Sequence, residues 1–169
     1  MNTLEIINKL NQNQSVFKSL LESKTESEYS WRPSPEKWNL KEIVCHLLDE
    51  EILDFGFRTN HTLDTPLETL PPIDPEGWVI SHDYASKDYH KTLSEFLEAR
   101  SKSVSWLKHQ THSNWNNVCK HPTLGDISAK AFLNNWLAHD YLHLRQIIRY
   151  EYQYLQTKTD TSLNYAGNW

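Results

Sequence analysis

The sequence predicts an all-α fold, an antiparallel four-helix bundle, from two observations. Four segments carry apolar residues at helical spacing, and all seven prolines lie outside these segments. Helices of similar length that are joined by turn-rich connections pack naturally as an antiparallel bundle. The chain of 169 residues is about the length of one domain, so we expect residues 1–169 to form a single domain.

The first two predicted helices cover about residues 3–23 and 39–60. The first is amphipathic, with apolar residues at three- and four-residue steps and Asn, Gln and Lys on its other face. The start of the second helix is well specified, because Asn39 and Glu42 have the spacing of a capping box. The prolines of the connection between these helices disfavour helix there.

The third and fourth predicted helices cover about residues 87–110 and 127–155, and a polar loop around Pro122 and Gly125 separates them. The fourth helix is the most apolar and should lie deepest in the bundle. Residues 61–85 hold four prolines and no clear period, which makes this a long loop for a compact domain. This segment is either a functional lid or partner contact, or a plain surface excursion.

Two of the predicted helices carry histidines on the face that should meet the core. On an ideal helical wheel, His139 and His143 fall in one narrow stripe of the fourth helix. The apolar members of this stripe are Phe132, Trp136, Ile147 and Tyr150. On the second helix, the wheel places His46 and Glu50 together on one face. The apolar residues of that face are Ile43, Leu53 and Phe57.

Three inward imidazoles need polar partners. Burying an unpaired polar group costs about 1–3 kcal/mol, and one shared metal ion would satisfy His46, His139 and His143 together. The alternative is that these are core histidines hydrogen-bonded to their neighbours. Histidine pairs four residues apart also arise by chance, so their placement within apolar stripes is the stronger observation.

Two segments resemble the signature regions of the DinB-like family, also called the DinB/YfiT-like family. They are residues 38–47 (WNLKEIVCHL) and residues 136–147 (WLAHDYLHLRQI), and the second contains the motif H-D-x-x-H-L-x-Q-I. The resemblance extends over nearly the whole chain in helix order. It implies a four-helix bundle with an up-down-down-up arrangement, in which one histidine of the second helix and two of the fourth bind a divalent metal.

Matched residue by residue, the metal ligands that the resemblance implies are His46, His139 and His143. All three family positions are histidine here, which favours an intact site, because many relatives lack one of the three. Three His ligands leave at least one coordination position open, which is the arrangement of a catalytic rather than a structural zinc site. Zinc and nickel both suit these ligands.

The resemblance and the open coordination position together lead to three functional hypotheses. The first is a metal-dependent enzyme that activates a low-molecular-weight thiol such as bacillithiol for S-transfer to an electrophile, similar to the bacillithiol and mycothiol transferases of the wider family. The second replaces the thiol by water and gives a metal-dependent hydrolase of amide or ester bonds. The third is a non-catalytic, metal-bearing stress-response or ligand-binding protein, consistent with the family's link by name to DNA-damage induction.

Two charged residues are candidate catalytic groups. Glu50, one turn beyond His46, could orient a metal ligand, act as general base or join the coordination sphere; alternatively it is a partly solvated carboxylate at a bundle end. Arg100 lies within the apolar stripe of the third helix, where it could bind a substrate carboxylate. Its alternative role is a buried salt bridge to Glu50 or Asp54.

Asp140 follows His139 in the chain but points about 100° away from it on the wheel. We therefore expect Asp140 to cap or pair structurally rather than to bind the metal. The two cysteines, Cys45 and Cys119, have neither the number nor the spacing of a disulfide framework or a zinc knuckle. We expect both to be buried small hydrophobes.

Composition excludes several classes of partner. A net charge of −5 without a Lys and Arg cluster removes the electrostatic basis for nucleic-acid binding, so we expect a small-molecule substrate instead. The N-terminal residues lack the apolar core of a secretory signal, and no apolar run is long enough to span a membrane. These observations predict a cytoplasmic protein. Many relatives form homodimers through helix faces, and the aromatic content allows a homodimer here.

Overall fold

In the computed structural model, which describes residues 1–167, long helices pack as a four-helix bundle. The bundle helices are α1 (Thr3–Leu21), the continuous helix α3–η1–α4 (Leu40–Asp49, Glu50–Phe55 and Gly56–Asp64), α6 (Tyr89–His109) and α7 (Ala129–Lys158). The short elements are α2 (Glu26–Tyr29), α5 (Trp78–Ser81), the 3₁₀ helices η2 (Tyr84–Ser86) and η3 (Asn164–Ala166), and the strands β1 (Val118–His121) and β2 (Gly125–Ser128).

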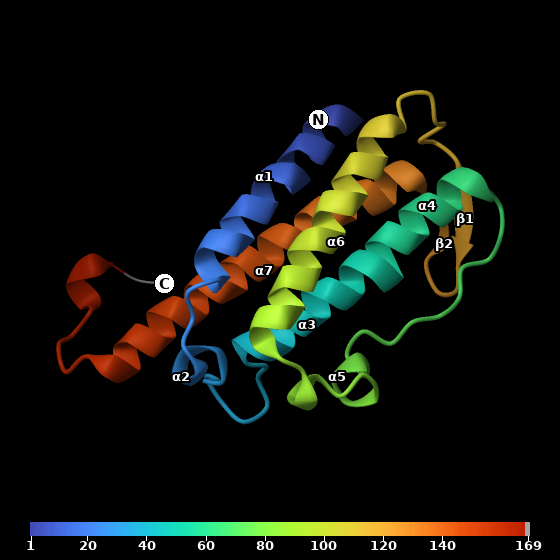
Figure 1. The fold of residues 1–169 in the computed structure, drawn as a ribbon. Coiled ribbons are helices and arrows are strands. Elements are labelled where there is room, and N and C mark those ends of the chain that lie inside the picture. The colour runs from blue at the N-terminus through green and yellow to red at the C-terminus, as the bar shows by residue number, and fades with distance from the viewer. Residues whose placement is uncertain (168–169) are drawn as a thin grey trace.

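The bundle has the expected up-down-down-up arrangement (Figure 1). Helices α1 and α7 run in one direction, whereas α3–η1–α4 and α6 run in the other. Helix α1 packs against α6 and α7, and α3–η1–α4 packs against the same two helices. Because the second and third bundle helices are parallel, the chain between them must return along the length of the bundle, which explains the long connection between α4 and α6.

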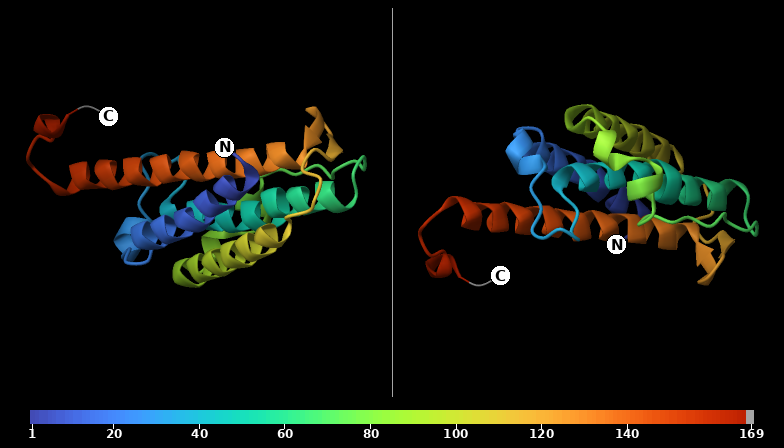
Figure 2. Two further views of the ribbon diagram at one scale, coloured as in Figure 1. Left: turned by 90° about the horizontal axis from the view of Figure 1, so that it is seen from above. Right: turned by 90° about the horizontal axis from the view of Figure 1, so that it is seen from below.

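Helix α7 is the longest element, with 30 residues, and Figure 2 shows its C-terminal end extending beyond the other bundle helices. Neither α7 nor any other helix within residues 1–167 combines the length and the hydropathy that crossing a membrane requires.

The bundle helices begin where the sequence supplies N-caps. The side chain of Asn39 accepts the backbone N–H of Glu42 at 2.9 Å, and the Glu42 carboxylate accepts the backbone N–H of Asn39 at 2.8 Å. This is the predicted capping box. The side chains of Asp88 and Ser128 cap α6 and α7 in the same position. These contacts satisfy N–H groups that would otherwise lack a partner inside the helix.

A layer of buried polar side chains separates the two largest apolar clusters of the core. One apolar cluster contains Phe17 and Phe96, and the other contains Leu10 and Val104. Arg100 lies between these clusters on α6. Asn13 occupies the same level on α1 and Asp140 on α7, and all three side chains of this layer are buried.

The polar loop expected around Pro122 and Gly125 is a β-hairpin. Strands β1 and β2 pair antiparallel, with Val118 opposite Ser128 and His121 opposite Gly125. Gly125 has φ 77°, a left-handed conformation that glycine adopts without steric cost. Each strand has only four residues, which is too short to give a clear alternating pattern in the sequence.

The segment 61–85 contains more regular structure than the sequence indicates. Helix α4 continues to Asp64, and α5 and η2 follow within the segment. The backbone N–H of Leu70 donates to the Lys120 carbonyl oxygen at 3.0 Å, which ties the middle of the segment to β1. Further on, Trp78 and Tyr84 bury the thiol-bearing side chain of Cys45. Both Cys45 and Cys119 are buried and unpaired, as expected.

A π-helical turn, η1, interrupts the second bundle helix at Glu50–Phe55. A π turn follows an i→i+5 hydrogen-bond pattern, so it rotates the residues after it relative to those before it. The apolar face that a uniform α-helix predicts therefore does not continue past Glu50. Leu53 and Phe57 are 40% and 42% exposed, and their assignment to the buried face is wrong.

Gly56 permits the π turn. A Cβ atom at this position would collide with the backbone carbonyl oxygen of Glu51, five residues earlier. We expect Gly56→Ala to lower the free energy of unfolding by about 1–3 kcal/mol, the usual cost of overpacking. Urea denaturation measures this change. Ser105→Ala, at an exposed position of α6, is the control and should stay within about 0.5 kcal/mol of the parent. Equal stability of Gly56→Ala and the parent would contradict this role of Gly56.

Candidate metal centre

The side chains of His46, His139 and His143 meet between α3 and α7. The Nε2 atom of His139 lies 3.3 Å from Nε2 of His46 and 3.0 Å from Nε2 of His143. The three candidate ligand atoms lie within 4.8 Å of one another. His46 and His143 are buried and His139 is half-buried. The structure thus brings together the three histidines that the sequence pattern identified.

Hydrogen bonds among these histidines cannot satisfy all of their nitrogens. His143 Nδ1 lies 2.9 Å from Oε1 of Gln146, and because an amide oxygen only accepts, Nδ1 carries the proton and Nε2 presents a lone pair. If His139 Nε2–H donates to that lone pair, it cannot also accept a hydrogen from His46. In addition, Nδ1 of His46 is buried and has no hydrogen-bond partner within residues 1–167. The cluster therefore fits a bound cation better than a set of hydrogen-bonded core histidines.

The spacing of the Nε2 atoms also suits a first-row divalent metal. Two imidazole ligands at about 2.0–2.1 Å from an ion, separated by an octahedral or tetrahedral angle, lie about 2.8–3.4 Å apart. The measured separations of 3.0 and 3.3 Å fall in this interval. Zinc and nickel both fit a site of this size and composition.

The surroundings keep the three imidazoles neutral, which is the form that binds metal. Burial, with a smaller contribution from His143, lowers the pKa of His46 to about 3. Burial and the neighbouring His143 and His46 lower the pKa of His139 to about 2. Burial also lowers the pKa of His143, although its hydrogen bond to Gln146 acts in the opposite direction. At neutral pH a metal ion would therefore have no proton to displace from these ligands.

Glu50 lies beside the histidines at the first residue of η1. Its Oε1 atom is 3.9 Å from Nε2 of His46, and its Oε2 atom is 4.0 Å from Nε2 of His139. The residue is only 5% exposed, so it is not the partly solvated carboxylate of the alternative interpretation. Burial raises the pKa of Glu50 to about 8, and repulsion by Asp54 adds to the shift. A cation bound to the histidines would oppose this shift, because it favours the carboxylate.

Aromatic rings enclose the cluster on two sides. The ring centroid of Trp38 lies 4.9 Å from that of His46, and the ring centroid of Phe55 lies 5.1 Å from that of His139. An apolar surround of this kind limits the access of water to a metal site.

Gln146 orients His143, but from the sequence this residue was identified only as part of the family motif and was assigned no role. Its spacing of three residues from His143 on the same helix was the signal for this contact.

Arg100 forms a buried salt-bridge network and does not contact the histidines. Its Nη1 and Nη2 atoms donate to the two carboxylate oxygens of Asp140 at 2.7 and 2.8 Å, and its Nε atom donates to Oε2 of Glu51 at 2.8 Å. The salt-bridge interpretation therefore describes Arg100, but the partners expected from the sequence, Glu50 and Asp54, were wrong. Asp54 pairs with Arg58 instead, with an Oδ1 to Nε distance of 2.6 Å.

This network joins all four bundle helices. Asp140 also accepts a hydrogen bond from Nδ2 of Asn13 on α1 at 2.9 Å, and Glu51 accepts one from Nε1 of Trp136 on α7 at 3.1 Å. Burial lowers the pKa of Arg100, but the carboxylates of Glu51 and Asp140 outweigh that effect and raise it above its ordinary value. The guanidinium therefore stays charged. Asp140 has the structural pairing role that its position on the helical wheel indicated.

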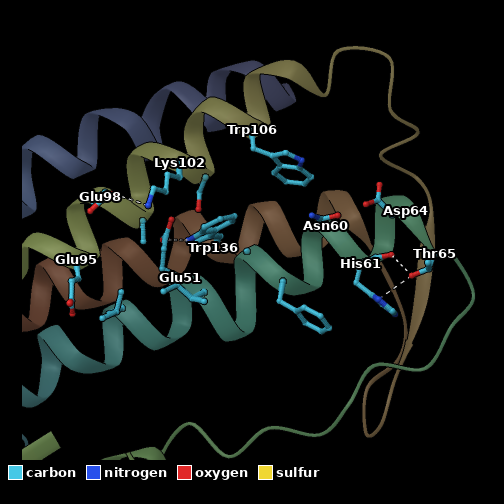
Figure 3. Close-up of a pocket in the computed structure, with 16 residues that line it drawn as sticks. Glu51, Asn60, His61, Asp64, Thr65, Glu95, Glu98, Lys102, Trp106 and Trp136 are labelled. Atoms are coloured by element: carbon cyan, nitrogen blue, oxygen red, sulfur yellow. Dashed lines mark hydrogen bonds and ion pairs between the residues drawn. The ribbon is translucent and has the colours of Figure 1, made fainter. Parts of the chain in front are cut away.

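Two large cavities lie along the bundle. One, of about 820 Å³, lies between α4 and α6 (Figure 3), where Glu51 and Trp136 line it and the exposed Glu98–Lys102 ion pair stands at its edge. None of the three histidines lines this cavity. The other, of about 890 Å³, is lined by His143 and by residues of α7 that follow it. Within residues 1–167, the three histidines form the one cluster of side chains with metal-ligand geometry.

The chain belongs to the DinB superfamily, whose family model matches residues 9–147. The match includes the three histidines and Glu50. The structure is also similar to that of YfiT from Bacillus subtilis, described as a probable metal-dependent hydrolase with an unusual four-helix bundle topology. The two share 20% sequence identity with a TM-score of 0.80, over 89% of this chain and 86% of that chain. This likeness establishes the fold. No curated protein matches the chain.

Loss of any one of the three histidines should abolish metal retention. We expect near-stoichiometric metal in the parent protein purified without added metal, and little in His46→Ala, His139→Ala or His143→Ala, measured by elemental analysis. Zinc at a hundred times its dissociation constant should stabilise the parent against unfolding by about 2.7 kcal/mol. The exposed His112→Ala is the control and should behave as the parent. Metal retained by all variants, or absent from every sample with unchanged stability, would contradict the site.

Removal of the Arg100 side chain should destabilise the bundle strongly. Arg100→Met leaves the carboxylates of Glu51 and Asp140 buried without their cation, which costs about 3–5 kcal/mol. Chemical denaturation measures the loss. Lys108→Met, at an exposed position in the same helix, should change stability by less than about 0.5 kcal/mol. A stability of Arg100→Met equal to that of the parent would show that the network contributes little.

Proposed function

We propose that this protein is a metal-dependent enzyme in which His46, His139 and His143 hold one divalent ion, zinc or nickel. The observation that supports this proposal is the convergence of the three ligand atoms within 4.8 Å beside a buried carboxylate. Three protein ligands leave a coordination position for a reacting molecule, whereas structural zinc sites use four. When bound, the ion would lower the pKa of a coordinated water or thiol and so provide a nucleophile at neutral pH.

The residues around the site have complementary roles in this proposal. The Oε1 atom of Gln146 accepts a hydrogen bond from Nδ1–H of His143 and so keeps the Nε2 lone pair directed into the cluster. Glu50 accepts the proton of the nucleophile. Its two oxygens lie 3.9 and 4.0 Å from the ligand atoms of His46 and His139, so a molecule bound beside those atoms would be within hydrogen-bond reach of the carboxylate. Trp38 and Phe55 restrict bulk water, which strengthens the electrostatic interactions within the site.

In the first version of this function the nucleophile is a low-molecular-weight thiol such as bacillithiol. Cys45 cannot supply the thiolate, because burial raises the pKa of its thiol to about 11. The other cysteine, Cys119, is fully buried among Leu70 and Phe132. The sulfur must then come from a small molecule, and the cavity of about 890 Å³ beside His143 has room for one. The S–H proton passes to Glu50, sulfur bonds to the electrophilic carbon, and the leaving group departs with the bonding electron pair.

In the second version the nucleophile is water, and the enzyme hydrolyses an amide or ester. The position of Glu50 supports this version, because metal-assisted hydrolysis requires a general base near the residues that would hold the ion. The description of YfiT as a probable metal-dependent hydrolase points in the same direction. Thiol dependence of turnover separates the two versions.

Glu50→Gln tests the proposal directly. Turnover of 4-nitrophenyl acetate and of 1-chloro-2,4-dinitrobenzene, each with and without bacillithiol or cysteine, should fall about 10²–10⁴-fold in this variant, because it loses its general base. Its metal content should match that of the parent. Glu26→Gln, at an exposed position of α2, is the control. Unchanged turnover in Glu50→Gln would exclude its role as base. A metal-loaded parent that turns over neither compound would favour the non-catalytic binding protein.

A further inference from the structure

The cavity beside His143 has a basic lining. It has a volume of about 890 Å³ and is bounded by α7 and the chain that precedes α3. Its polar side chains are Lys37, His143, Arg145, Gln146, Arg149, Tyr150 and Gln153. No acidic side chain belongs to its lining within the described part of the chain. Three fixed positive charges therefore face a cavity that reaches a candidate metal ligand.

The cations of this cavity form no close ion pair within the described residues. Arg145 and Arg149 are four residues apart on α7, so their like charges share one face of the helix and repel each other. Neither they nor Lys37 form an ion pair with another residue of the range 1–167. Other surface lysines are paired, for example Lys18 with Glu22 at 3.7 Å. An unpaired basic pair at this spacing costs stability unless a ligand compensates for it.

The cavity is also linked to the candidate metal centre, because one residue, Gln146, contacts both. Gln146 lines it, and its Oε1 atom also accepts a hydrogen bond from Nδ1–H of His143, with an Nδ1 to Oε1 distance of 2.9 Å. A neighbouring, smaller cavity shares Lys37 and Gln146 but contains Glu36 and Glu76. The two arginines line only the basic cavity, whereas the two acids line only its neighbour. An anion would therefore bind at the arginine end rather than at the lysine end.

We infer that Arg145 and Arg149 bind an anionic group of the substrate, a carboxylate or a phosphate, while the rest of the substrate extends toward His143. The planar guanidinium groups match such oxyanions with two parallel hydrogen bonds. The inference rests on the proposed function in one respect, namely that the bound molecule is a substrate that reacts near His143. Binding of the anion itself does not depend on turnover.

Calorimetric titration of the zinc-loaded, full-length protein tests this inference. The ligands are glutarate, phenyl phosphate and the neutral analogue glutaramide. We expect the two anions to bind and glutaramide not to bind, and the tighter anion identifies carboxylate or phosphate as the preferred group. The double variant Arg145→Gln/Arg149→Gln should weaken anion binding about tenfold or more. Added sodium chloride should weaken it in the parent as well. Lys108→Gln/Lys130→Gln, at two exposed positions, is the charge-matched control, and both double variants should retain zinc.

Three results would overturn the inference. The first is that neither anion binds the parent, and the second is that glutaramide binds as well as glutarate. The third is that the double variant binds the anions as tightly as the parent while His46→Ala loses them, which would place the anion on the metal. These results are distinguishable from a failure of catalysis. A protein that shows no turnover but still binds anions through the arginines would contradict only the proposed function.

Discussion

The buried guanidinium of Arg100 fixes how the helices of this bundle are rotated about their axes. It donates two hydrogen bonds to Asp140 on α7 and one to Glu51 on η1. Asp140 directly follows His139, and Glu51 directly follows Glu50, so the same contacts fix the directions of the neighbouring site residues. Any other rotation of these helices would leave a buried charge without its partner, which is more costly than the loss of apolar contact. The geometry of the candidate metal centre therefore depends on the ion pairs of Arg100, although Arg100 does not contact the three histidines.

The π turn allows two adjacent glutamates to serve different partners. Both side chains are buried, with Glu50 facing the histidines and Glu51 facing Arg100. The change of helical register at η1 then turns the following α-helix so that Arg58, Thr59 and Thr62 are buried in place of the apolar face that precedes it. Backbone irregularity of this type is often found at functional sites. Here it lies between the candidate ligands and the polar layer that supports them.

The sequence predicted most where the helix is regular. Helix α7 is uninterrupted over 30 residues, so the ideal wheel correctly places His143, Ile147 and Tyr150 on its buried face. His46 lies before the π turn, and its inward position was predicted equally well. Beyond Glu50 the helical wheel assigns residues to the wrong face. The spacing of apolar residues does not reveal that a π turn adds one residue to a helical turn. The partners of Arg100 were also wrong, because spacing along one helix does not show which residues of other helices face it.

The remaining errors concern short elements. The four-residue strands of the hairpin carry too few positions for a period to appear, and their pairing depends on the turn at Gly125. The hydrogen bond between Gln146 and His143 was not predicted, because sequence spacing gives proximity but not donor and acceptor roles. By contrast, the capping box of Asn39 and Glu42 is a local contact between residues three apart, and it was predicted correctly.

The parallel course of α3–η1–α4 and α6 affects the order in which the protein can fold. The long connection delays the contact of these helices, because more chain entropy must be lost before they meet. The ligands His46 and His139 are 93 residues apart and lie on the second and the last bundle helix. The site consequently assembles only when α7 docks, so metal capture reports completion of the tertiary structure. This bundle should therefore refold more slowly than an up-down-up-down bundle of the same length.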